Sequence, residues 1–167
     1  MRNQAVSDTA SRSSAFVEAR ATVRASADRV YDLIADYRTG HPRIVPPKYF
    51  RNLEVERGGR GEGTVITYEM KLLGKMRKSR ARVSEPNPGR VLVETVEDQD
   101  IVTTFRVDPT GPFSSSVTIS TTVPTRQGML GALERALVRR LLAPIYRDEL
   151  ALLDRVAASD NGPRQVQ

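Results

Sequence analysis

The sequence contains no cysteine and no tryptophan, and it has a single histidine, His41. Without cysteine the chain cannot form a disulfide, and it offers no thiolate metal ligand and no cysteine nucleophile. One histidine excludes a histidine-rich metal cluster and makes any histidine-based catalytic triad depend on His41. We therefore expect neither a metal nor a cofactor, and the commonest hydrolase mechanisms are disfavoured.

Long apolar runs are also missing. No stretch approaches the ~18 uninterrupted apolar residues of a membrane-spanning helix, and residues 1–14 lack the apolar core of a signal peptide. These absences predict a cytoplasmic protein. The 167 residues fit one domain, which we place at residues 15–158, between a disordered N-terminal arm (1–14) and a disordered tail (159–167).

The first part of the domain reads as a strand followed by helix. Residues 17–23 alternate apolar and charged or polar side chains, which is typical of a half-buried strand. Ser26 can cap the helix that follows, and apolar residues then recur at helical spacing as far as Tyr37. Prolines 42, 46 and 47 stop this helix and leave room for one further short turn around Ile44.

From residue 50 to residue 123 the apolar period becomes two. Short turns rich in glycine, proline, asparagine and aspartate separate the runs, and such short connections favour antiparallel hairpins. The sequence therefore predicts a six-strand meander over Phe50–Arg57, Thr64–Leu73, Lys75–Glu85, Arg90–Glu97, Ile101–Asp108 and Ser115–Val123.

A long helix is predicted from about Arg126 to Ala158, with Leu133, Leu137 and Leu141 packing its first half against the sheet. Pro144 removes one helical hydrogen bond and predicts a bend. Two interpretations of this bend stay open. It either makes the helix a movable wall or only curves it along a twisted sheet.

Three segments resemble a known family: ASADRVYDLIADY (25–37), the glycine-rich turn 58–63 and APIYRDEL (143–150). With the order of elements over residues 15–158, they are similar to the START-like superfamily, which includes the polyketide cyclase/dehydrase and lipid-transport families. The resemblance implies an α+β helix-grip fold. In that fold a curved antiparallel sheet of about seven strands wraps a long C-terminal helix, two short helices follow strand 1, and a cavity holds a hydrophobic or amphipathic small molecule.

The strand faces that would line such a cavity mix apolar side chains with a few hydroxyls, as ligand sites do. Plain packing against the long helix explains the same stripes. The predicted cavity residues are Ile66, Tyr68, Met70, Ala81, Thr103, Phe105, Ile119, Thr121, Leu137, Leu141 and Ile145.

Two further features carry weaker hypotheses. His41 could serve as a general acid or base, although a loop or helix-end histidine is the simpler interpretation. The excess of basic residues, +6 overall, is concentrated between residues 71 and 82. Lys78, Arg80 and Arg82 fit a solvated strand face paired with Glu69 and Glu94, or a surface for anionic lipids.

No aromatic residue interleaves this basic segment, so nucleic acid is not an expected partner. The glycines of residues 58–63 have neither the spacing nor the following helix of a phosphate loop. The sequence thus favours binding or transport of a lipid-like or polyketide-like molecule. An aromatase/cyclase-type enzyme acting on a polyketide is the first alternative, and a protein- or membrane-surface interaction module is the second.

Overall fold

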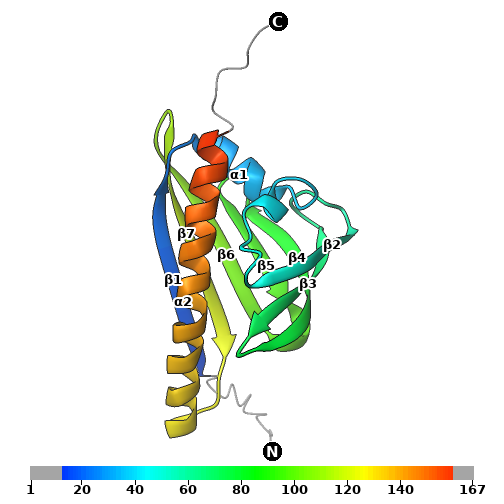
Figure 1. Ribbon diagram of the computed structural model, residues 1–167, viewed down its shortest axis with the longest axis vertical. Coiled ribbons are helices and arrows are strands. Elements are labelled where there is room, and N and C mark those ends of the chain that lie inside the picture. Colours follow the sequence, from blue (N-terminus) through cyan, green and yellow to red (C-terminus); the bar gives the residue numbers. More distant parts are fainter. Residues whose placement is uncertain (1–12, 160–167) are drawn as a thin grey trace, which may run out of the picture.

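The computed structural model describes residues 13–159, which form one antiparallel sheet and one long helix (Figure 1). The predicted arm and tail fall almost wholly outside these residues. The described elements are β1 (Ser14–Val23), α1 (Ala27–Ala35), the 3-10 helix η1 (His41–Arg43), β2 (Phe50–Arg57), β3 (Val65–Leu72), β4 (Lys75–Asn87), β5 (Val91–Val96), the 3-10 helix η2 (Glu97–Gln99), β6 (Ile101–Gly111), β7 (Ser114–Pro124) and α2 (Gly128–Ser159).

The seven strands follow the order β1-β7-β6-β5-β4-β3-β2, so the predicted meander and the helix-grip architecture are confirmed. Each strand from β2 to β7 pairs with its neighbour in sequence because the turns between them are short. At the β3–β4 turn both Leu73 (φ 52°) and Gly74 (φ 76°) are left-handed, as a two-residue hairpin turn requires. The connection through α1 and η1 carries the chain from one sheet edge to the other.

The glycine-rich turn between β2 and β3 fastens the end of α1 to the sheet. Its glycines have positive φ, as the sequence predicts. The Tyr37 amide donates to the Gly59 carbonyl (2.9 Å), and the Gly61 amide donates to the Ala35 carbonyl (3.0 Å). A Cβ on Gly59 would come within 2.3 Å of the Arg38 side chain. The turn therefore fixes where the chain leaves α1 and begins η1.

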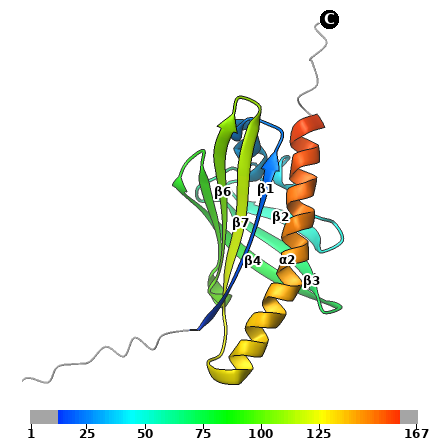
Figure 2. The same cartoon turned by 90° about the vertical axis from the view of Figure 1, so that its left-hand side faces the viewer.

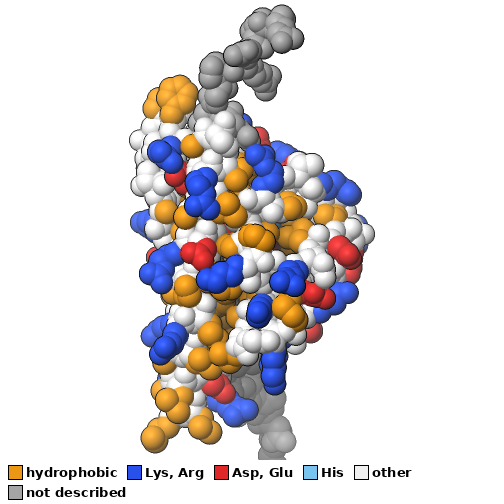
Figure 3. Space-filling view, in the orientation of Figure 1, with side chains coloured by type: hydrophobic (Ala, Val, Ile, Leu, Met, Phe, Trp, Pro, Cys, Tyr) orange, Lys and Arg blue, Asp and Glu red, His pale blue; other side chains and the backbone are white. Residues whose placement is uncertain are grey.

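From about Leu142 onward α2 packs closely against the sheet, whereas most of its first turns are exposed. Leu142, Ile145, Leu150 and Leu153 are buried, whereas Leu133 is 69% exposed. Figure 3 shows hydrophobic side chains exposed at the lower end of α2. The prediction that the leucines of the first half pack on the sheet is therefore wrong for Leu133 and Leu137, which are exposed with Met129 and Leu130.

These leucines are exposed because the first half of α2 turns a different face toward the edge strand β1. Arg135 donates to the Ser13 hydroxyl (2.7 Å) and Arg139 to the Phe16 carbonyl (3.3 Å). Arginine side chains thus tie this half to β1, and the leucines point elsewhere. Pro144 lies inside the continuous helix, and Figure 2 shows the helix axis changing direction near its middle.

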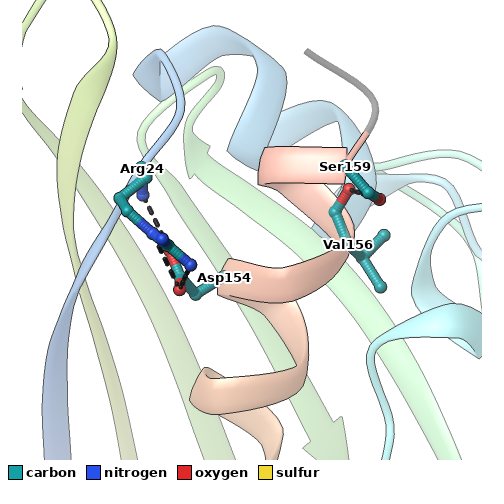
Figure 4. Close-up of polar contacts among 4 residues, drawn as sticks. All are labelled: Arg24, Asp154, Val156 and Ser159. Atoms are coloured by element: carbon teal, nitrogen blue, oxygen red, sulfur yellow. Dashed lines mark hydrogen bonds and ion pairs between the residues drawn. The ribbon is translucent and has the colours of Figure 1, made fainter. Parts of the chain in front are cut away.

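At the other end of α2, Arg24 and Asp154 join β1 to the helix (Figure 4). The Arg24 backbone amide and guanidinium both donate to the Asp154 carboxylate, at 2.9 Å and 2.7 Å. These hydrogen bonds lower the pKa of Asp154 below its ordinary value. One turn further on, the Ser159 hydroxyl donates to the Val156 carbonyl (3.0 Å) and closes the helix end.

The two halves of α2 should therefore respond differently to the same substitution. We expect Leu153→Ala, at a side chain that is 1% exposed, to lower the free energy of unfolding by about 2–5 kcal/mol. Leu133→Ala should change it by less than about 0.5 kcal/mol. Urea denaturation followed by circular dichroism measures both. Equal losses would contradict the unequal packing of the helix.

Candidate functional site

Two neighbouring chambers lie between the sheet and α2. The inner chamber has a volume of about 40 Å³, is bounded partly by η1, and contains His41, Glu94 and Glu149 in its wall. The outer chamber has a volume of about 140 Å³ and lies against the middle of α2, at Val138, Leu141, Leu142 and Tyr146. Both chambers are lined in part by Tyr68, Met70, Thr103 and Tyr146.

Most of the residues predicted from sequence to line a cavity lie in these walls. Ile66 and Phe105 line the inner chamber, and Thr121 and Leu141 line the outer one. Tyr68, Met70 and Thr103 line both. The other predicted residues do not appear in either wall. Ala81, Ile119 and Ile145 are buried in the core, and Leu137 is 43% exposed.

His41 is buried at the first position of η1, not in an open loop. Its Nδ1 lies 2.7 Å from the Ile34 carbonyl, which can only accept, so Nδ1 carries a proton. The imidazole stacks on Tyr37, with ring centroids 4.4 Å apart. The other ring nitrogen, Nε2, is therefore directed toward Glu94, 3.7 Å from its Oε1.

Glu94 enters the chamber from β5. The Tyr37 hydroxyl donates to its Oε1 at 2.5 Å. Burial, followed by the negative charge of Glu94, raises the pKa of Tyr37 well above its ordinary value. Tyr37 therefore remains a proton donor to Glu94 and holds this carboxyl from one side.

Glu149 faces the chamber from α2. It is 3% exposed, and its Oε1 has no hydrogen-bond partner among the described residues. Burial is the main reason that the pKa of Glu149 lies well above its ordinary value, and the charge of Glu94 adds to it. A carboxyl in this setting holds its proton at a pH where a solvated glutamate has lost it.

Hydroxyl groups complete the polar part of the walls. Thr103 and Thr121 are hydrogen bonded to each other (2.9 Å), and Thr121 is also bonded to the Tyr146 hydroxyl. Burial raises the pKa of Tyr68 and of Tyr146. Both phenols therefore stay protonated at neutral pH and can donate to a bound molecule.

Neither carboxyl is among the site residues predicted from sequence, although each interrupts an apolar pattern. Glu94 lies between Leu92 and Val96 on one face of β5, and both neighbours are buried. Glu149 lies four residues from Ile145 and four from Leu153 on the buried face of α2. An acidic residue at a core position of a strand or helix was the available indication.

The expected pairing of Glu94 with the basic strand is wrong, because Glu94 faces the inner chamber. Arg80 instead pairs with Glu56 of β2 (2.8 Å), and Arg82 pairs with Glu97 (2.9 Å). Two of the three basic residues considered for anionic lipids thus have acidic partners within the protein.

Neither a metal site nor a membrane span is found in the part of the chain that the structure describes. Across residues 13–159 no group of three or more histidine or acidic side chains is placed to hold a metal ion. No helix in this range is both long enough and apolar enough to cross a membrane.

Comparisons with known proteins agree with this architecture. A sequence model of the family described as polyketide cyclase/dehydrase and lipid transport matches residues 14–158. The KanY protein, solved by NMR, is 26% identical, covers 88% of this chain and 98% of its own, and superposes with a TM-score of 0.74. No curated protein matches the chain.

Two more distant structures share the fold. The ZhuI aromatase/cyclase from Streptomyces sp. R1128 is 19% identical over 87% of this chain and 94% of its own, with a TM-score of 0.69. Norcoclaurine synthase from Thalictrum flavum, solved with dopamine and hydroxybenzaldehyde, is 16% identical over 98% of this chain and 97% of its own, with a TM-score of 0.67.

The buried carboxyl makes a prediction about stability. Between the ordinary glutamate pKa, near 4.5, and the raised value, folded Glu149 keeps a proton that the unfolded chain has lost. Stability contributed by this group therefore falls as pH rises through that window. We expect Glu149→Gln to stabilise the protein by about 1–3 kcal/mol above the window, with a smaller gain below pH 4.5.

Urea denaturation at pH 4.5 and pH 8 measures this difference. Glu18→Gln is the matched control, because Glu18 is exposed on β1. A Glu149→Gln effect that does not depend on pH, or a loss of stability at pH 8, would show that Glu149 is ionised and stabilised in the native protein.

Proposed function

The chain belongs to the polyketide cyclase/dehydrase and lipid transport family, and from this premise we propose that it binds a small amphipathic molecule between the sheet and α2 and acts on it by proton transfer. The size of the outer chamber supports the binding part. Its volume of about 140 Å³ is close to that of an engineered apolar cavity of ~150 Å³ that takes up benzene. One aromatic ring therefore fits without rearrangement.

One observation carries the catalytic part. Three titratable side chains, His41, Glu94 and Glu149, line one chamber of about 40 Å³. A protein that only carries a hydrophobic molecule needs apolar walls and a few polar anchors. Here a histidine, the buried Glu149 and the largely buried Glu94 line one chamber, and one oxygen of Glu149 has no partner among the described residues. Such clusters are typical of sites that move protons.

The arrangement supports two opposite roles. Burial raises the pKa of Glu149 well above its ordinary value, so it holds a proton at a pH where a solvated glutamate has lost it and can donate that proton to an oxygen of the bound molecule. His41 carries its proton on Nδ1, which leaves Nε2 beside Glu94 to accept one. The Tyr68 and Tyr146 hydroxyls can orient the molecule by donating hydrogen bonds. An acid and a base acting on one carbonyl compound can enolise it, and they can remove water from it.

The named relatives support this choice over simple carriage. The Streptomyces structure is that of an aromatase/cyclase, and the Thalictrum structure is that of a synthase with two aromatic molecules bound. Ring closure with loss of water, as in an aromatase/cyclase-type reaction, needs an acid and a base. Transport of a lipid-like molecule is the alternative. Substitution of His41 or Glu149 would leave such transport intact.

A generic proton-transfer substrate tests the proposal without knowledge of the natural one. When a base removes the C3 proton of 5-nitrobenzisoxazole, the N–O bond breaks and a coloured cyanonitrophenolate forms. We expect the protein to accelerate this reaction, and Glu149→Gln and His41→Ala each to lower the rate by about 10²-fold. The rate should fall as pH rises through the raised pKa of Glu149, because the acid that protonates the departing phenolate oxygen is then lost.

Two variants serve as controls. Glu18→Gln, on the exposed side of β1, should leave the rate unchanged. Leu141→Trp enlarges a side chain in the wall of the outer chamber and should weaken binding of the probe. A rate equal to that in buffer, or one that survives both Glu149→Gln and His41→Ala, would contradict proton transfer in the chamber and favour a carrier.

A further inference from the structure

The walls of the inner chamber are acidic and lack a matching positive charge. Glu94 and Glu149 both contribute carboxyl groups, and no lysine or arginine is among the lining residues. His41 is the one basic side chain there. Arg77 belongs to the wall of the outer chamber and is exposed to solvent. A ligand that entered with a negative charge would meet two carboxyls at close range.

The Oε1 atom of Glu149 is buried and has no hydrogen-bond donor among the described residues. A buried polar atom without a partner is costly, and a ligand that supplies an N–H to the ionised carboxyl would remove that cost. Glu94 is only 12% exposed and accepts one hydrogen bond from Tyr37, so it too can accept from a bound donor.

Aromatic rings surround these carboxyls. Phe50 and Tyr68 lie with ring centroids 5.8 Å apart, and Phe105 and Tyr146 are in the same wall. The faces of aromatic rings are electron-rich and attract cations. Carboxylates combined with aromatic faces form a site for an organic ammonium group.

We propose that the bound molecule is an arylalkylamine, whose ammonium group lies in the inner chamber between Glu94 and Glu149 and whose ring lies in the outer chamber. This inference rests on the binding part of the proposed function, because it assumes that the cavity takes up a ligand. The inner volume of about 40 Å³ holds roughly three water-sized groups, which suits an ammonium and one or two carbons but not a ring. The outer volume suits a ring, and the shared wall residues require only a short linker.

Binding of an ammonium should be linked to proton release. In the empty chamber burial, and after it the charge of Glu94, raises the pKa of Glu149 and so favours its protonated form. A cation beside it favours the ionised form. The other titratable groups that line this chamber are His41 from η1, Tyr68 from β3 and Tyr146 from α2, and both phenols stay protonated at neutral pH.

Three probes of nearly equal size test the inference: 2-phenylethylamine, 2-phenylethanol and phenylacetate, which are cationic, neutral and anionic at pH 7. In isothermal titration calorimetry we expect the amine to bind at least about 10-fold more tightly than the alcohol, and phenylacetate to bind most weakly. In buffers of different ionisation enthalpy, the heat of amine binding should differ by the heat of the released protons, whereas that of alcohol binding should not.

Variants separate charge recognition from cavity binding. Glu149→Gln should weaken the amine at least about 10-fold and change alcohol binding by less than about 3-fold. Glu18→Gln should change neither. If the alcohol binds as tightly as the amine, or if Glu149→Gln keeps the preference for the amine, the arylalkylamine assignment is overturned while cavity binding stands. If none of the three probes binds at millimolar concentration, the proposed function fails and this inference fails with it.

Discussion

Burial of the Glu149 carboxyl against a second acidic side chain is the constraint on which the properties of this cavity depend. Removing a carboxylate from water is costly unless it is paired, and Oε1 of Glu149 has no partner among the described residues. The protein accommodates this group as a neutral acid. The same burial that raises its pKa also places it in the wall of a chamber large enough for part of a ligand.

The fold produces this situation through unequal packing of α2. The C-terminal half of the helix, joined to β1 through Arg24 and Asp154, packs Ile145 and Leu153 against the sheet and carries Glu149 inward with them. The opposite wall is set by the end of α1, where hydrogen bonds to the glycine-rich turn fix Tyr37 and hence the stack of Tyr37 on His41. Residues near the end of α1 thus hold Glu94, whereas α2 carries Glu149.

The architecture was predictable from sequence because it depends on patterns that local chemistry makes visible. Alternating side chains and turn residues identified the meander, and three- and four-residue spacing identified α2. Charge alone does not reveal either carboxyl as part of a site; its position on a buried face does. Glu94 was assigned to the solvated face, although Leu92 and Val96 place it on the buried one.

A similar limit explains the error in α2. Leucines recur through its first half, but periodicity does not show which side of a helix meets the sheet. In the structure Arg135 and Arg139 contact Ser13 and Phe16 at the start of β1, and these partners lie more than a hundred positions away in the sequence. The register of β5 and the rotation of α2 about its axis depend on tertiary contacts. The site lies between these two elements.

The protonation state of Glu149 is the central claim, and an NMR titration tests it directly. With ¹³C at the side-chain carboxyl of glutamate, the resonance absent from Glu149→Gln is assigned to Glu149, and its chemical shift is followed against pH. The account predicts a single titration with a midpoint well above the ordinary glutamate value, and a return toward ionisation when 2-phenylethylamine is added at neutral pH. A midpoint near 4.5, the value of a solvated glutamate, would contradict it.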